Sequence, residues 1–408
     1  MSDFKDRFLE ALKPYHRAHV ALQQFSREGS ALVDGEQLVE AASLGVILKA
    51  AEDISRPDRK RLSESKKNAK ELLSQDSITL SAVGFSRDDI ASLRDVDAGH
   101  GNSFRFRVSK KNGFQFVKVN PDADEEVLFD RDKWEKQRLS ALDTAIAQGA
   151  NIISFGETDY QEHSDRACEE KFQEKIKAKI DAVERPIFLI AGTDYDHEEN
   201  EAASTCLNRA RIFPNKTLLS QERDDIPSRP ILHPKLHAAE RTDERISSPE
   251  RPRIVYYETI LGNIAVLICV DAYNPTVVMS LLRNRGSLDK DQIDFILVPS
   301  YNKSAKLFYA CQVLSLLSGS VVMLIDTCGK EATKPAQTAV FVHGRLFSDL
   351  LEDPDVGLDT CGEYLSEDPH SPVRTCRLSL DFLRELRSKE TSLTPTFNQV
   401  VHHFLRAP

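Results

Sequence analysis

The 408-residue chain lacks several features that would place it at once in a common class of proteins. No apolar stretch approaches the roughly 18 residues needed to span a bilayer, and no internal repeat or low-complexity tract occurs. The first residues, MSDFKDRFLEALKPYHRAH, are charged and amphipathic and contain no apolar core of a signal peptide. We therefore expect a cytoplasmic protein without a membrane partner.

Cysteine is scarce and scattered. The chain has seven cysteines, an odd number, and none of them forms a CxxC pair. This pattern favours reduced thiols over a disulfide framework or a zinc knuckle. The formal net charge of −10 disfavours a nucleic-acid partner.

Familiar catalytic motifs are also missing. The sequence contains no GxSxG, no GxxxxGK[ST] and no GxGxxG, so serine hydrolase, nucleotide hydrolase and dinucleotide-binding functions lack support. His233 and His237 are four residues apart, a spacing that can bind a metal, but Pro234 and Lys235 replace the second half of a zincin motif. A lysine there would repel a cation, and we expect neither a metal nor an organic cofactor.

The periodicity of apolar residues changes along the chain. Residues 1–75 show helical spacing, whereas the stretch that begins near Phe104 alternates and carries Asn112-Gly113, a strong hairpin signal. We predict a helical domain or extension at 1–103, a main domain at 104–390 and a tail at 391–408. The segment 220–253, rich in charge and proline, reads as loop.

Residues beyond 130 alternate between amphipathic helical stretches and short apolar strands. Helices are expected at RDKWEKQRLSALDTAIAQGA, at KFQEKIKAKIDAV and near 305–318. Strands are expected at NIISF, PIFLIAG, NIAVLI, DFILVPS, VVMLID and TAVFV. This alternation is typical of an α/β domain with buried sheets.

Three polar residues follow predicted strands or lie in a loop, where α/β domains usually place their sites. Glu157 follows NIISFG, Lys235 lies in ILHPKLHAAE, and Cys269 follows IAVLI. A buried cysteine is more often part of a core than a nucleophile, and each signal is weak alone. In combination they offer a thiol, a base for its proton and a cation for a developing oxyanion.

The order and context of these residues resemble the carbon–nitrogen hydrolase (nitrilase) superfamily over residues 112–390. GANIISFGE supplies the glutamate, PKLH supplies the lysine, and LICVD supplies the cysteine. The resemblance implies a four-layer αββα sandwich in which Glu157, Lys235 and Cys269 are the catalytic residues. It leaves open whether Glu240 or Glu244 is a second active-site glutamate.

The function that this resemblance implies is hydrolysis of a nonpeptide carbon–nitrogen bond through a covalent thioester. An amide, N-carbamoyl compound or nitrile would be the small-molecule substrate, and the protein would form a homo-oligomer. The chain departs from the family pattern after the cysteine, at 272–275, and in the helix at 314–318. The alternative is therefore a catalytically degenerate member in which 1–103 and 314–318 serve a regulatory or interaction role.

Overall fold

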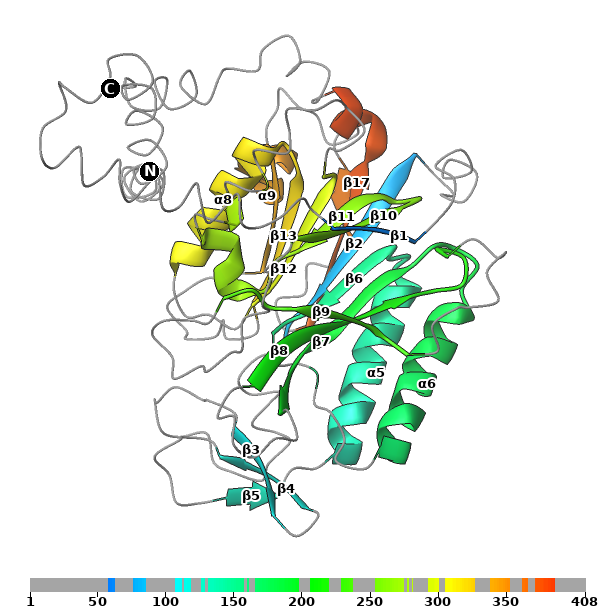
Figure 1. Cartoon of the computed structure of the whole chain (residues 1–408). Helices are drawn as coiled ribbons and strands as arrows, with labels where there is room; N and C mark the ends of the chain where they lie inside the picture. Colours follow the sequence, from blue (N-terminus) through cyan, green and yellow to red (C-terminus); the bar gives the residue numbers. More distant parts are fainter. Residues whose placement is uncertain are drawn as a thin grey trace, which may run out of the picture.

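A computed structural model of the chain contains two large β-sheets and one small sheet (Figure 1). It describes residues 58–62, 76–85, 107–111, 114–118, 126–128, 131–157, 160, 166–197, 206–219, 229–237, 254–274, 277–278, 281, 293–300, 305–326, 338–352, 362–365 and 371–385. The predicted tail at 391–408 lies outside these ranges, as does most of the predicted helical region at 1–103.

Sheet A has seven strands in the order β1, β10, β11, β12, β13, β14 and β15. Their bounds are β1 (Asp58–Arg61), β10 (Val255–Thr259), β11 (Gly262–Val266), β12 (Phe295–Ser300), β13 (Val321–Asp326), β14 (Ala339–Val342) and β15 (Arg345–Leu346). The central strands β11, β12 and β13 are parallel, and antiparallel β10 and β14 flank them. Parallel strands buried on both faces read as continuous apolar runs, which explains the sequence signal for this sheet.

Sheet B also has seven strands, in the order β16, β17, β2, β6, β7, β8 and β9. Their bounds are β16 (Gly362–Tyr364), β17 (Val373–Ser379), β2 (Ser77–Val83), β6 (Ile152–Phe155), β7 (Phe188–His197), β8 (Cys206–Pro214) and β9 (Ile231–Pro234). Strands β2, β6 and β7 are parallel, and antiparallel β17 and β8 flank them. The five central strands of sheets A and B thus share one pairing pattern, whereas the edge strand β1 of sheet A pairs parallel and both edge strands of sheet B pair antiparallel.

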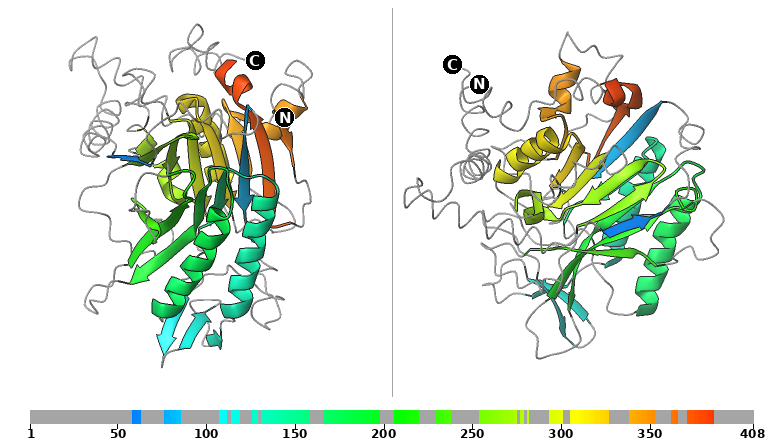
Figure 2. Two further views of the ribbon diagram at one scale, coloured as in Figure 1. Left: turned by 90° about the vertical axis from the view of Figure 1, so that its right-hand side faces the viewer. Right: turned by 45° about the horizontal axis from the view of Figure 1, so that its top comes forward.

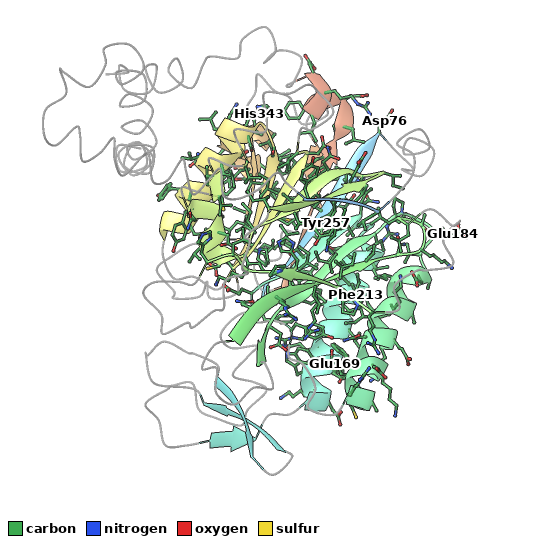
Figure 3. The ribbon with its side chains drawn as sticks, in the orientation of Figure 1. Asp76, Glu169, Glu184, Phe213, Tyr257 and His343 are labelled. Carbon is green, nitrogen blue, oxygen red and sulfur yellow. The ribbon has the colours of Figure 1, made fainter. Side chains whose placement is uncertain are left out.

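The two sheets pack face to face, and helices cover their outer faces (Figures 1 and 2). Tyr257 of β10 stacks on Phe188 of β7 with 5.5 Å between ring centroids, and Figure 3 shows Tyr257 among the strands. Helices α5 (Arg131–Ala147) and α6 (Arg166–Asp181) cover sheet B, and α8 (Ala305–Ser318) covers sheet A. The described part of the chain is therefore an α/β fold in four layers.

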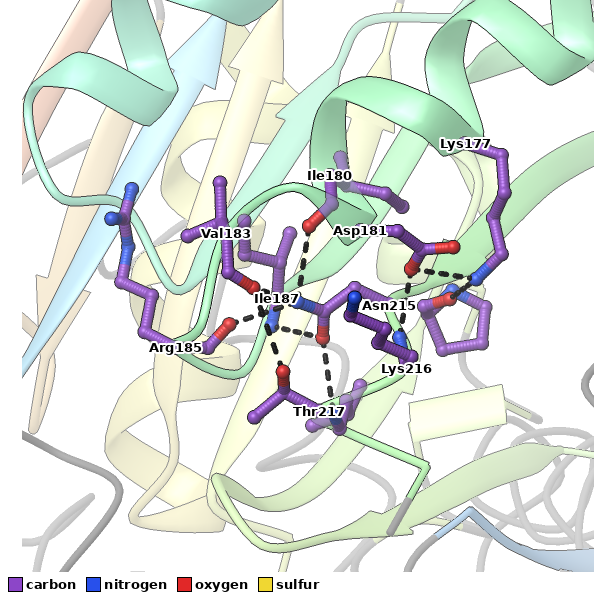
Figure 4. Close-up of polar contacts among 11 residues, drawn as sticks. Lys177, Ile180, Asp181, Val183, Arg185, Ile187, Asn215, Lys216 and Thr217 are labelled. Carbon is purple, nitrogen blue, oxygen red and sulfur yellow. Dashed lines mark hydrogen bonds and ion pairs between the residues drawn. The ribbon is translucent and has the colours of Figure 1, made fainter. Parts of the chain in front are cut away.

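The connection from α6 to β7 depends on one buried amide, that of Asn215 (Figure 4). Its Nδ2 donates to the carbonyl oxygens of Ile180, Val183 and Arg185 at 3.2, 3.3 and 2.8 Å. Its Oδ1 accepts the backbone N–H of Ile187 at 2.9 Å. The last carbonyls of a helix lack intrahelical partners, so this side chain ends α6 and sets the start of β7.

The predicted domain boundary at residue 104 is wrong for the described part of the N-terminal region. Strand β2 lies inside sheet B, paired with β17 on one side and β6 on the other. Its Ile78 and Leu80 are buried between the two sheets. Strand β1 adds a parallel edge to sheet A. Both segments belong to the sandwich because they complete its hydrogen bonds and its core.

Two local predictions can be compared directly with the backbone. The hairpin is confirmed: β3 (Arg107–Lys111) and β4 (Phe114–Lys118) pair antiparallel across a two-residue connection. With β5 (Glu126–Leu128) they form the small sheet, which Figure 1 shows at the lower left, below the strands of sheet B. The loop expected over 220–253 is interrupted by β9, which lies at the edge of sheet B. Proline cannot donate to a strand ladder, and an edge strand can contain Pro234 because it has a neighbour on one side only.

Candidate active site

Three predicted site residues follow strands of both sheets. Glu157 comes two residues after β6, and Lys235 comes directly after β9. Cys269 follows β11 of sheet A and begins a 3₁₀ turn, Cys269–Tyr273. Because sheets A and B pack face to face, these strand ends meet at one edge of the sandwich.

Glu157 and Lys235 form an ion pair that is closed off from solvent. The Lys235 Nζ lies 2.7 Å from the Glu157 Oε1, and the two side chains are 1% and 3% exposed. Burying two charges costs several kcal/mol per ion before their attraction is counted, so such a pair is weak evidence for a stabilising role. The direct contact between the two charges offsets part of this cost.

The Cys269 thiol lies beside this pair and is 4% exposed. Burial raises the pKa of the thiol well above its ordinary value, and the negative charge of Glu157 raises it further. The charge of Lys235 and the hydroxyl of Ser300 oppose this shift. Ser300 ends β12, and its Oγ lies 3.7 Å from the sulfur. The resting thiol therefore carries its proton, and attack by the sulfur needs a base.

Asp271 ties the turn that carries Cys269 to the segment that carries Lys235. Its carboxylate accepts the backbone N–H groups of Leu236 and His237 at 3.0 and 2.9 Å. The Nδ1 of His237 is a further 3.0 Å from the same carboxylate. Asp271 is 1% exposed, so these contacts are shielded from water and fix the cysteine and the lysine relative to each other.

Asn208 of β8 makes a second polar contact with the glutamate. Its Nδ2 donates to the Glu157 Oε1 at 2.9 Å, and its backbone carbonyl accepts the N–H of Lys235 at 2.8 Å. Sequence analysis did not single out Asn208 or Ser300, because an asparagine within a strand and a serine at a strand end have no distinctive spacing. Proximity in the folded chain reveals both residues.

The two histidines that the sequence offered as possible metal ligands have different partners. His233 lies between the sheets, with its Nδ1 3.1 Å from the Tyr257 hydroxyl, whereas the Nδ1 of His237 faces Asp271. Within the described ranges, no group of three or more His, Cys, Asp or Glu side chains is placed to hold a metal ion. Glu240 and Glu244 lie outside the described residues.

Comparison with known proteins gives a result only among solved structures. Neither a protein-family model nor a curated protein matches the chain. An amidase from Nesterenkonia sp. is 12% identical with a TM-score of 0.43, and the match covers 77% of this chain and 95% of the amidase. A mutant of the Nesterenkonia AN1 amidase, described as being from the nitrilase superfamily, is 10% identical with a TM-score of 0.43 and coverages of 77% and 96%.

A double mutant of the same amidase in complex with acrylamide is 10% identical, with a TM-score of 0.45 and coverages of 78% and 97%. The structural neighbours are nitrilase-superfamily amidases. Among the described residues, no helix is long and apolar enough to cross a membrane.

Proposed function

We propose that the protein is a cysteine-dependent hydrolase of nonpeptide carbon–nitrogen bonds, acting on a small amide, N-carbamoyl compound or nitrile. The observation that carries the proposal is the buried ion pair of Glu157 and Lys235 at 2.7 Å, beside the protonated thiol of Cys269. In this proposal Glu157 is the base, Lys235 donates to the oxyanion, and Cys269 is the nucleophile.

In the first half of the reaction on an amide, Glu157 takes the proton from the Cys269 sulfur as that sulfur bonds to the carbonyl carbon. The Lys235 ammonium and a backbone N–H of the turn at Cys269 donate to the oxyanion that forms. Collapse of this intermediate breaks the carbon–nitrogen bond. The proton held by Glu157 passes to the departing amine, and a thioester remains.

The second half returns the enzyme to its starting state. Glu157 takes a proton from water, and the hydroxide bonds to the thioester carbon. The carbon–sulfur bond then breaks, the carboxylic acid leaves, and Glu157 gives its proton back to the sulfur. The raised pKa of the thiol agrees with this cycle, because the sulfur regains its proton after each turnover.

A screen of the full chain for released ammonia tests the proposal, with amides, N-carbamoyl compounds, ureides and nitriles as substrates. We expect turnover with at least one class, and a mass increase on Cys269 when the reaction is quenched with acid. Glu157→Gln should remove both signals.

The proposal fails if no class is hydrolysed and iodoacetamide labels Cys269 no faster than the partly exposed Cys168. The degenerate interaction module would then become the leading function. For the helix at 314–318, Leu314, Ser315 and Ser318 are already buried against the rest of the chain, which leaves little of that segment for a partner.

A further inference from the structure

Glu157 can act as a base only if one oxygen of its carboxylate faces the thiol. The last torsion of a glutamate side chain is broad and nearly two-fold, so a carboxylate with one partner keeps much of its rotational freedom. Here Oε1 accepts two hydrogen bonds, from the Lys235 Nζ at 2.7 Å and from the Asn208 Nδ2 at 2.9 Å. One donor lies on β8 and the other directly after β9, and together they restrict the carboxylate plane.

Asn208 lies where an apolar side chain would otherwise be expected. Along β8 the side chains of Ala210 and Ile212 belong to the apolar core between the sheets, and Asn208 continues this row by the two-residue period of a strand. It is 1% exposed. Burying an amide is costly unless it is hydrogen-bonded, and the Asn208 Nδ2 donates to the carboxylate of the candidate base.

We propose that Asn208 is a positioning residue that, together with Lys235, holds the carboxylate of Glu157 by its Oε1 and so orients this base toward the Cys269 thiol. A carboxylate oxygen has two lone-pair sites, which two donors from different directions can share. This inference rests on the proposed function, in which Glu157 is the base.

The backbone of Asn208 allows a clean test. Its carbonyl oxygen accepts the N–H of Lys235 at 2.8 Å, and this bond is kept whatever side chain position 208 carries. Asn208→Leu, similar in size, therefore removes one donor to Glu157 and retains the register of Lys235. Asn208→Asp is closer still in shape, and it replaces the donor with a second carboxylate against Oε1.

A matched control is available at the opposite end of β6. Asn151 precedes this strand and is also buried, accepting from the Thr79 N–H at 3.1 Å and donating to the Pro186 carbonyl at 3.2 Å. Asn151→Leu should lower the melting temperature without touching the base. This control separates the effect of lower protein stability on the labelling rate from the effect of a misplaced Glu157 carboxylate.

The experiment measures the rate at which iodoacetamide alkylates Cys269 at pH 7.5, followed by mass spectrometry on the full chain below its melting temperature. We expect Asn208→Leu and Asn208→Asp to react about 10–100-fold more slowly than wild type, as misplaced catalytic groups do. Asn151→Leu should react at the wild-type rate. With an amide substrate, kcat should fall for Asn208→Leu while KM stays within about three-fold, because the substrate-binding groups are unchanged.

The outcomes separate the two proposals. If Glu157→Gln reacts as fast as wild type, Glu157 is not the base and the proposed function fails. If Glu157→Gln is slow but both Asn208 variants react at the wild-type rate, only the role of Asn208 is overturned. If Asn208→Leu does not fold, the labelling rate of Asn208→Asp decides whether Asn208 positions Glu157.

Discussion

Cys269 has a backbone φ of 51°, in the left-handed region that residues other than glycine seldom occupy. Such a conformation costs on the order of 1–3 kcal/mol and persists only where the surroundings impose it. Here Ile268 enters the turn in an extended conformation, and Asp271 anchors the turn to the segment after Lys235. The strained backbone brings the sulfur off the end of β11 and toward Glu157, a use that core packing does not require.

Replacing Cys269 by serine separates a nucleophile from a packing residue. The hydroxyl is nearly isosteric with the thiol but a much weaker nucleophile at this site, so we expect turnover to fall by at least about 1,000-fold. The free energy of unfolding should change by less than about 2 kcal/mol. Ammonia release and urea unfolding measure the two effects. Turnover close to wild type in Cys269→Ser would rule out the thioester mechanism.

The sequence allowed the three candidate residues to be identified because each stands at a strand end or in a recognisable local context. The choice of nucleophile over core cysteine for Cys269 came from the combination of the three residues and the family resemblance, because the local sequence of Cys269 fits either role. That choice depends on Glu157 and Lys235 lying next to the sulfur, from positions 112 and 34 residues earlier in the chain. Asn208 was beyond reach for a similar reason, since its contact with Glu157 follows from the pairing of β8 with β7 and of β7 with β6.

At the scale of elements, prediction succeeded where a strand is buried on both faces. DFILVPS and VVMLID became β12 and β13, and the helix expected near 305–318 became α8. β9 was missed because an edge strand of four residues needs only one neighbour, and its proline and flanking charges hide it. β2 was missed although SITLSAV alternates polar and apolar residues as a strand does, and the structure buries both kinds in the centre of sheet B.

His233 links three elements across the interior. It stands on β9 of sheet B, its Nδ1 faces the hydroxyl of Tyr257 on β10, and it hydrogen-bonds to the backbone of Val266 on β11. These contacts join the strand before Lys235 to the strand before Cys269. Burial, and after it the charge of Lys60, lower the pKa of His233 to about 4 against the opposing effect of the bond to Val266. The ring is therefore neutral in the folded protein near pH 7.

The lowered pKa of His233 predicts that the folded protein loses stability in mild acid. An unfolded histidine has a pKa near 6.5, so between pH 6.5 and about 4 the unfolded chain binds a proton that the folded chain excludes. The stabilisation is complete above pH 6.5 and is lost as the pH falls toward 4. From pH 7 to pH 5 we expect His233 to contribute a loss of about 2 kcal/mol.

Urea unfolding of wild type and His233→Gln at both pH values measures this contribution. The variant should be less stable than wild type at pH 7, but its stability should fall by about 2 kcal/mol less on going to pH 5. Asn151→Leu, which changes no titratable group, should keep the wild-type pH dependence. Equal pH dependence in wild type and His233→Gln would mean that His233 does not couple folding to protonation.

For the whole molecule, the common pairing pattern of sheets A and B defines the folding unit. Each sheet has three parallel strands at its centre, and in sheet B the first of them is β2, which precedes the small sheet in the chain. The residues between β2 and α5 are thus an insertion between neighbouring strands of one sheet. A division of the chain at residue 104 would separate β2 from the partners that satisfy its hydrogen bonds.

Two truncations test this organisation. Of the elements that the structure describes, a chain that starts at residue 63 loses β1, a four-residue edge strand, whereas a chain that starts at residue 104 also loses β2. Removing β2 opens the edges of β6 and β17 and uncovers the core around Ile78, Leu80 and Val83. Each of these larger side chains contributes about 1.5–3 kcal/mol through burial, and their sum approaches the 5–15 kcal/mol that usually separates folded from unfolded proteins.

We therefore expect the chain from residue 63 to be soluble and to unfold cooperatively, with a melting temperature a few degrees below that of the full chain. The chain from residue 104 should aggregate or show no cooperative transition by circular dichroism. If it melted like the full chain, β2 would be dispensable and the predicted domain start at residue 104 would stand.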